Sequence, residues 1–216
     1  MPIRIPQLGL AFGVLLAPAA EGAAASEPVR VVALGTSLTE GIDWAQRLGQ
    51  GLAACWGRPV AVERVAASGR TSSWGRDQVR RVAALRPSIV LVEFAMNDAN
   101  WRRFVSLARS RENTLAIARG IRASVPDARV VLMTTNTVHG LRGMMRPRVG
   151  AYYAAYRELA AAEGLGLVDL APLWGALSPE RLRRAVPDGV HPTLDAFEEG
   201  ALPEIVSVLT EGSCRG

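Results

Sequence analysis

Short apolar runs alternate with amphipathic segments along most of the chain. Runs rich in β-branched and aliphatic residues predict strands at 29–34, 60–65, 89–94, 130–135 and 165–170. The first, third and fourth runs are apolar enough to be buried on both faces of a sheet. Helical patterns fill the intervals, at about 44–56, 76–85, 111–125, 147–163 and 193–209. Strands that alternate with helices indicate an α/β fold with a mainly parallel five-stranded sheet, covered on both sides by helices.

The beginning of the chain has a different pattern. Arg4 precedes an apolar run over 8–20, and small residues follow at 23–25, which is typical of a secretory signal peptide. The apolar run is too short to span a bilayer comfortably. An uncleaved anchor and a merely Ala-rich extension are the alternatives. We expect a signal peptide over 1–25 and one compact domain over 26–216, exported to the periplasm or secreted.

No later apolar run approaches membrane-spanning length, so we expect no integral membrane segment in the mature chain. The net charge is +5, and all 25 basic residues are Arg, with no Lys. These arginines are scattered among acidic residues and form no long basic stripe. We therefore expect no nucleic-acid partner, although a modest attraction to anionic surfaces or substrates is compatible with this charge.

The two cysteines, Cys55 and Cys214, allow two interpretations. In an oxidising compartment they could form a disulfide that ties the C-terminal tail to the first long helix. A buried, inert Cys55 and a loose Cys214 fit the sequence equally well.

Four polar or glycine residues follow the predicted strands. Ser37 follows the first strand, Gly69 the second and Asn97 the third, and His191 comes after the fifth. Because parallel strands present their carboxyl ends at one edge of a sheet, all four are expected to project to the same edge. That edge is where open α/β sheets bind ligands.

These residue types fit acyl-transfer chemistry. A serine hydroxyl needs an imidazole to accept its proton and a carboxylate to hold the ring, and Ser37, His191 and Asp188 can fill these roles. An Asp three residues before a His, on a Gly-containing turn, can reach Nδ1 and leave Nε2 free. The Asn97 amide could donate to a developing oxyanion, and Gly69 would let a backbone amide approach the substrate closely.

Each short motif also has a purely structural interpretation. Ser37 and Glu40 fit a helix capping box, and Asp188 could simply form a turn beside Gly189. Asn97 could close the third strand in an Asx turn. A metal site at Asp188 and His191 would need further ligands, and the other histidine, His139, lies in a different loop. We therefore expect no metal and no organic cofactor.

At these residues the chain resembles the SGNH hydrolases, also called the GDSL family of esterases and lipases. The resemblance covers essentially the whole mature chain and implies a small three-layer α/β/α sandwich like flavodoxin. It implies that Ser37 is the nucleophile, His191 the general base and Asp188 the residue that orients the ring. The Ser37 amide, the Gly69 amide and the Asn97 side chain would form the oxyanion hole.

Three positions depart from the family pattern. Thr36 stands where the family usually has Asp, Ala95 where it has Gly, and Ala67 where it often has Asn. These changes spare the reacting atoms, so they bear on local geometry and substrate more than on the type of reaction.

The expected activity is ester hydrolysis through an acyl-serine intermediate, with a small-molecule or glycan ester as substrate. We favour short-chain or carbohydrate O-acetyl esters because no long apolar lid is visible. Lysophospholipase or thioesterase activity, acyl transfer to a sugar hydroxyl, and a non-catalytic glycan-binding module are the alternatives. The loop 136–150 could contribute Met side chains to an acyl pocket and arginines to an anion, or it could be an ordinary basic surface loop.

Overall fold

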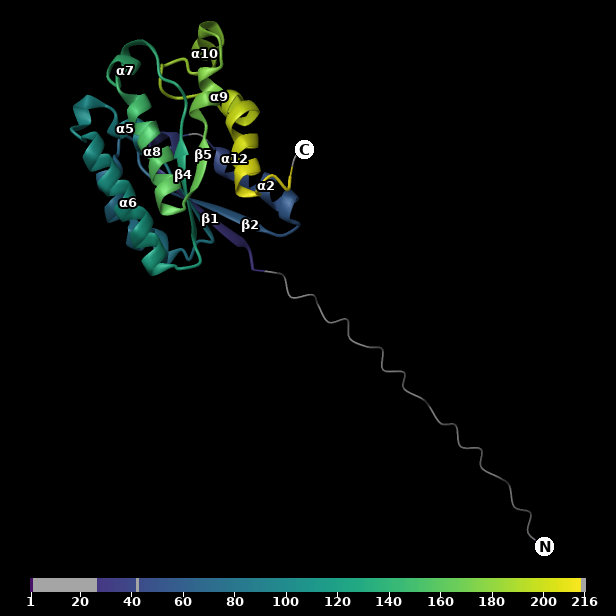
Figure 1. Cartoon of the computed structure of the whole chain (residues 1–216). Coiled ribbons are helices and arrows are strands. Elements are labelled where there is room, and N and C mark those ends of the chain that lie inside the picture. Colours follow the sequence, from purple (N-terminus) through teal and green to yellow (C-terminus); the bar gives the residue numbers. More distant parts are fainter. Residues whose placement is uncertain (2–26, 42, 215–216) are drawn as a thin grey trace.

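One parallel five-stranded sheet organises the structure, which is a computed structural model describing Met1 and residues 27–41 and 43–214 (Figure 1). Its strands are β1 (Val29–Gly35), β2 (Val60–Ala66), β3 (Ile89–Val92), β4 (Arg129–Thr134) and β5 (Gly166–Asp169). They pair in the order β2-β1-β3-β4-β5, and every pair is parallel. The predicted leader and its cleavage near Ala25 lie outside the described residues.

Four long helices cover the sheet, with α6 (Leu107–Ser124) and α8 (Val149–Glu163) on one face and α2 (Trp44–Trp56) and α12 (Leu202–Leu209) on the other (Figure 1). The shorter helical elements are α1 (Ser37–Glu40), α3 (Ser72–Asp77), α4 (Val79–Ala84), α5 (Ala95–Asp98), η1 (Trp101–Arg103), α7 (Gly140–Met144), α9 (Ala171–Gly175), α10 (Pro179–Ala185), α11 (Leu194–Ala196) and η2 (Phe197–Ala201). The three-layer α/β/α arrangement confirms the predicted fold class.

Strand alternation explains the two apolar layers. Val31 and Ala33 of β1 pack with the cluster under α2 and α12, whereas Val32 and Leu34 pack with the cluster under α6 and α8. Successive side chains of a strand point to opposite faces, so a strand covered on both sides must be apolar throughout. All four residues of β3 are buried, and so are five of the six in β4. The prediction that the first, third and fourth strands are buried on both faces is confirmed.

Helix boundaries differ from the sequence prediction in three places. Helix α6 begins at Leu107 because the Ser106 hydroxyl accepts a hydrogen bond from the Arg109 amide and caps it. The single helix expected over 76–85 is two helices, α3 and α4, joined at Gln78. The last helix contains the π segment η2, which leads into α12 at Leu202. Pro203, in the first turn of α12, has no amide proton for the helical ladder.

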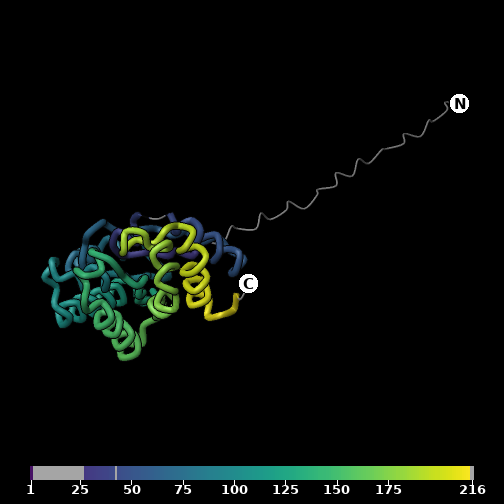
Figure 2. The backbone as a smooth tube through the Cα atoms, turned by 90° about the horizontal axis from the view of Figure 1, so that it is seen from above, coloured from purple at the N-terminus to yellow at the C-terminus, as the bar shows by residue number. Residues whose placement is uncertain are grey.

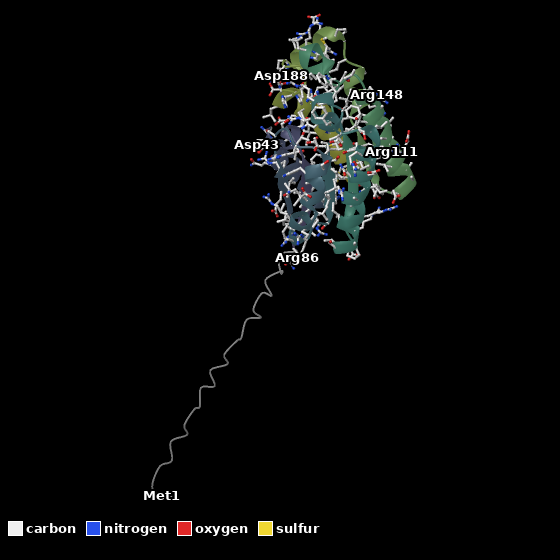
Figure 3. All side chains as sticks on the ribbon, turned by 90° about the vertical axis from the view of Figure 1, so that its left-hand side faces the viewer. Met1, Asp43, Arg86, Arg111, Arg148 and Asp188 are labelled. Atoms are coloured by element: carbon white, nitrogen blue, oxygen red, sulfur yellow. A yellow bond between two sulfur atoms is a disulfide. The ribbon has the colours of Figure 1, made fainter. Side chains whose placement is uncertain are left out.

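The strand order places the sheet's reversal point between β1 and β3, and the loops after these strands gather at one edge. In Figure 1, α5 and α7 lie at this edge, near the top of the view. Figure 3 places Asp188 at the end of the molecule opposite Arg86, which precedes β3. The predicted residues therefore share the edge at which open α/β sheets bind ligands.

Cys55 and Cys214 form a disulfide, so the first of the two interpretations of the cysteines holds. The bridge joins the end of α2 to the tail after α12, and the Cα atoms are 5.7 Å apart. Seen from above in Figure 2, the last described residues of the chain lie close to this early part of it. Within the residues that the structure describes, none of the helices has the length and apolar character needed to cross a membrane.

The disulfide closes a loop with a sequence separation of 159 residues, so its loss should enlarge the entropy of the unfolded chain. We expect the double variant Cys55→Ala/Cys214→Ala to lose about 2–4 kcal/mol of unfolding free energy, measured by urea denaturation. Dithiothreitol should lower the wild-type protein to the same level and leave the variant unchanged. Two titratable thiols in the air-oxidised protein would contradict this assignment.

Candidate active site

The turn after β1 presents Ser37 at the start of a short helix. The strand ends at Gly35, and Thr36 has the extended backbone of an N-cap, with its hydroxyl accepting a hydrogen bond from the Leu38 amide at 3.3 Å. Ser37 is thus the first residue of α1 and its hydroxyl is not used as a cap. The capping-box interpretation of Ser37 is wrong: Glu40 instead accepts hydrogen bonds from the amide and hydroxyl of Ser68, at 2.7 and 2.6 Å.

Three side chains from distant parts of the chain form a continuous hydrogen-bonded series. Ser37 Oγ lies 2.8 Å from His191 Nε2, and His191 Nδ1 lies 2.7 Å from Asp188 Oδ2. Ser37 and His191 are 154 residues apart in the sequence. With Nδ1 protonated and held by the carboxylate, Nε2 faces the hydroxyl as a proton acceptor. This geometry can deprotonate Ser37.

A tight turn builds the Asp188 side of the site. Gly189 has φ +82°, a conformation that L side chains rarely adopt. Asp188 Oδ1 accepts the Val190 and His191 amides at 2.9 and 2.7 Å. Partial burial alone would raise the pKa of Asp188, but the hydrogen bonds from the His191 ring and from both amides outweigh it and hold this pKa well below its usual range. Asp188 is therefore a carboxylate at neutral pH.

Arg142 of α7 also contacts this carboxylate. Its Nη1 donates to Asp188 Oδ2 at 2.7 Å, the same oxygen that faces the His191 ring. The ion pair is half exposed, so its contribution to stability is small, but it fixes where a cation sits beside the imidazole.

Hydrogen-bond donors converge on the other side of Ser37. Asn97 Nδ2 donates one proton to the Arg70 carbonyl at 2.8 Å, which fixes the amide group and leaves its second proton available. Gly69 has φ +72°, and a Cβ there would lie 2.8 Å from Arg103 Nη2. The Ser37 amide belongs to the first turn of α1, where N–H groups have no acceptor within the helix. The structure thus brings together all five residues that the sequence predicts.

One cavity of about 490 Å³ is lined by four of these five residues, and the fifth, Asp188, contacts His191 from outside the lining. Most of its lining residues are of polar or charged types, and they are Ser37, Gly41, Ser68, Gly69, Asn97, Arg103, Arg142, Arg146, His191 and Pro192. A second cavity of about 540 Å³ lies beside α9 and α10 and contains none of the predicted residues. We therefore place the candidate site in the first cavity.

A buried carboxyl group supports the Ser37 turn from below. Glu93 follows β3 and is fully buried. Its Oε1 accepts hydrogen bonds from the Thr36 amide at 2.6 Å and from the hydroxyls of Thr36 and Thr39 at 2.9 and 2.7 Å. A Cβ at Gly35 would overlap Thr39 Oγ1 and this carboxyl group, so only glycine fits there. Burial raises the pKa of Glu93 to about 7 despite these hydrogen bonds.

Sequence reasoning missed several residues that line or support the site. Glu93 falls inside a run read as an apolar strand, and a charged residue in such a run was the available signal. Arg142 and Arg146, from the loop 136–150, line the cavity, whereas Leu141 and Met144 from the same loop are exposed. This loop therefore contributes arginines, and not methionines, to the cavity wall. Nothing in the sequence distinguished Arg103 from its neighbours.

The predicted residues do not gather into a metal centre within the residues that the structure describes, where no group of three His, Cys, Asp or Glu side chains is placed to hold an ion. His139 Nε2 lies 2.7 Å from the Val186 carbonyl, and the His139 amide donates to the Gly189 carbonyl at 3.1 Å. His139 thus supports the turn that carries Asp188.

The α/β/α sandwich and the hydrogen-bonded series of Ser37, His191 and Asp188 are typical of serine hydrolases. A model of the GDSL-like lipase/acylhydrolase family matches residues 33–197. The chain belongs to this family and is an ester-hydrolysing enzyme. The resemblance to SGNH hydrolases is confirmed. A comparison with curated protein sequences found no match.

Three solved structures with the same fold illustrate the range of proteins that this chain is similar to. A lipase/acylhydrolase from Enterococcus faecalis is 24% identical, with a TM-score of 0.74 over 84% of this chain and 95% of the other. TesA is also 24% identical, with a TM-score of 0.64 and coverages of 84% and 97%. A catalytic mutant of Axe2, an acetylxylan esterase from Geobacillus stearothermophilus, is 17% identical, with a TM-score of 0.69 and coverages of 87% and 96%. At these identities the likeness concerns the fold.

The raised pKa of Glu93 predicts a pH dependence of stability. A carboxyl group that holds its proton more tightly when folded favours folding below its unfolded pKa, and this contribution is lost as the pH rises through the folded pKa. As the pH rises from 4.5 to about 7, this loss at Glu93 should lower the unfolding free energy of the protein by about 3 kcal/mol. The Glu93→Gln variant, whose amide stays neutral, should lose much less stability over this interval in urea denaturation at several pH values.

Glu63→Gln on the exposed side of β2 is the matched control for removal of a carboxylate, and it should follow the wild-type pH dependence. If Glu93→Gln also follows the wild type, Glu93 keeps its charge in the folded protein and the prediction is wrong.

Proposed function

We propose that this enzyme is an exported serine esterase that hydrolyses carboxylic esters through an acyl-Ser37 intermediate. One observation carries the proposal: the series from Ser37 Oγ through the His191 ring to Asp188, with bonds of 2.8 and 2.7 Å. These are hydrogen-bond distances between a nucleophile, a base and the group that orients the base.

In the proposed mechanism His191 Nε2 removes the Ser37 proton as Oγ attacks the ester carbonyl carbon. The carbonyl oxygen becomes an oxyanion, which the Ser37 amide, the Gly69 amide and Asn97 Nδ2 stabilise. His191 then protonates the leaving alcohol as the tetrahedral intermediate collapses to acyl-Ser37. Water enters, His191 accepts its proton, and a second collapse releases the carboxylic acid and restores the serine hydroxyl.

The polar cavity supports a short acyl group or a sugar-linked ester. Pro192 is the largest apolar side chain among the lining residues, and the others are polar, charged or glycine. A long hydrocarbon chain gains binding energy from large apolar side chains, and none of the described residues that line this cavity has one. The likeness in fold to a protein described as an acetylxylan esterase is compatible with a carbohydrate O-acetyl ester.

One observation favours a lipolytic substrate as the second candidate. Large apolar side chains are exposed on η1, directly after it and on α7, namely those of Trp101, Phe104, Leu141 and Met144. The Trp101 amide donates to the Met145 carbonyl at 3.1 Å, so the two segments adjoin beside the cavity. Exposed apolar groups near a site can contact a lipid aggregate, as a lysophospholipase requires.

Export rests on two further observations. The first residues have the pattern of a secretory signal peptide, and Cys55 and Cys214 form a disulfide. Disulfides persist in oxidising compartments such as the periplasm, which supports the proposed location.

Substitution of the proposed nucleophile tests the reaction. The Ser37→Ala variant should retain the fold and lose nearly all turnover of 4-nitrophenyl esters, because no hydroxyl remains to accept the acyl group. In the wild-type protein, kcat/KM should fall from the acetate to the palmitate ester. A fluorophosphonate probe should label the wild-type protein and not Ser37→Ala. Turnover that survives in Ser37→Ala would refute the assignment, and a preference for long chains would favour the lipolytic candidate.

Substitution of Asn97 tests the oxyanion hole. Because its free N–H would act on charge that develops only in the transition state, Asn97→Ala should lower kcat about 10²–10³-fold and change KM little. Its side chain also binds the Arg70 carbonyl, so urea denaturation must show that the variant is folded. A rise in KM with kcat unchanged would place Asn97 in ground-state binding.

A further inference from the structure

Three arginine side chains share the wall of the active-site cavity with Ser37. They are Arg103 from η1, Arg142 from α7 and Arg146, which follows α7. Among the residues that the structure describes, no aspartate or glutamate lines this cavity. Its wall therefore carries more positive charge than the proposed hydrolytic mechanism requires.

Arg146 is the buried member of the group, with 7% of its surface exposed. Its guanidinium donates to two backbone carbonyls, those of Met96 at 3.1 Å and Arg142 at 2.9 Å. These acceptors orient the side chain without supplying a negative charge. Burial lowers the pKa of Arg146, and the neighbouring Arg103 and Arg142 lower it further. Arg103 and Arg142 are thus each close enough to repel Arg146.

Asp188 is the one carboxylate among the described residues that pairs with any of them. It binds Arg142 at 2.7 Å, and the same oxygen contacts His191 Nδ1 at 2.7 Å. When His191 carries a proton during the reaction, this carboxylate must balance two cations. Asp188 also attracts Arg146 at longer range, but among the described residues neither Arg103 nor Arg146 has a carboxylate in direct contact.

Arg103 is the free cation of the group. Within residues 27–41 and 43–214 its guanidinium makes neither a hydrogen bond nor an ion pair. It nevertheless lies over the cavity, because Nη2 is 2.8 Å from the point where a Gly69 Cβ would sit. Gly69 is one of the proposed oxyanion donors, so this exposed guanidinium stands beside the reacting carbonyl.

Many surface arginines elsewhere in the protein have acidic partners. Arg47 pairs with Glu198, Arg111 with Glu158, Arg119 with Glu163 and Arg157 with Asp169. The three cavity arginines differ from these because one of them, Arg142, has a carboxylate partner and the other two have none among the described residues. An anionic ligand would supply the negative charge that the protein's own side chains do not provide in this cavity.

From this arrangement we propose that the natural ester carries an anionic group, a carboxylate or a phosphate, close to the scissile bond, and that Arg103 binds it. A guanidinium fork offers two parallel N–H donors to either group. This inference rests on the proposed esterase function and names a property of its substrate. Arg103 is then a specificity-determining residue, while Arg142 and Arg146 maintain the positive field around it.

Matched pairs of neutral and anionic esters test the proposal. One pair places the charge in the acyl group: 4-nitrophenyl butyrate and mono-4-nitrophenyl succinate. Two others place it in the alcohol: an O-acetyl glucoside with the O-acetyl glucuronate, and O-acetylglucose with its 6-phosphate. We expect kcat/KM for at least one anionic ester to exceed that of its neutral partner by about tenfold or more. The pair that shows the preference identifies the anion and its side of the ester bond.

Variants assign the preference to Arg103. Arg103→Gln should remove most of it, Arg103→Lys should keep part of it as a charge without the fork, and added salt should weaken it. Arg119→Gln is the control for loss of one positive charge, because Arg119 pairs with Glu163 near the opposite end of the strands, and it should keep the preference. If Arg103→Gln does not fold, Arg103→Lys and the salt series still test the proposal.

Three results would overturn the proposal. The first is a wild-type enzyme that hydrolyses neutral esters and prefers none of the anionic ones. The second is a preference that Arg103→Gln leaves intact. The third is an equal loss of kcat for both members of a pair in Arg103→Gln, which would make Arg103 a stabiliser of the oxyanion. If folded wild-type protein hydrolyses none of the esters and Ser37 resists a fluorophosphonate, the esterase function itself fails, and this inference fails with it.

Discussion

The buried carboxyl group of Glu93 joins the ends of the neighbouring strands β1 and β3, and the geometry of the site depends on it. It accepts hydrogen bonds from the Thr36 amide and from the hydroxyls of Thr36 and Thr39, all in the turn that begins α1. Glu93 itself lies four residues before Asn97. One side chain thus links the turn of the proposed nucleophile to the segment of a proposed oxyanion donor. Thr36, which stands where the family usually has Asp, is neutral, so Glu93 supplies the carboxyl group of this contact.

The sequence was sufficient to predict the sheet, its faces and the meeting of Ser37, Gly69, Asn97, Asp188 and His191. Apolar periodicity is local, and parallel pairing brings the residues after successive strands to one edge. The remaining features depend on contacts between distant residues. The extended backbone of Thr36 and its hydrogen bonds to Glu93 decide that Thr36, and not Ser37, caps α1. Arg103 can lie over the cavity because Gly69 has no side chain in its way. The sequence pattern likewise did not predict the break at Gln78 between α3 and α4.

One oxygen of Asp188, Oδ2, accepts hydrogen bonds from both the His191 ring and the Arg142 guanidinium. A carboxylate that served the ring alone would neutralise the imidazolium formed during the reaction. Here a fixed cation already shares it, so the site as a whole keeps a positive charge when the ring is protonated. The backbone amides of Val190 and His191 donate to the other oxygen, Oδ1, and so fix the orientation of the carboxylate between the ring and the guanidinium.

A positive cavity can serve catalysis in two physically different ways. Donors that meet charge only as the oxyanion forms lower the barrier of the chemical step, and the proposed roles of Asn97 and the amides of Ser37 and Gly69 are of this kind. A cation that binds a charge already present in the substrate stabilises the ground state and the transition state alike, so it acts on capture of the substrate. The structure separates these tasks: the donors are short groups fixed at the strand ends, whereas Arg103 reaches over Gly69 from η1 on an exposed side chain. Reaction type and substrate choice can therefore rest on different segments of one cavity.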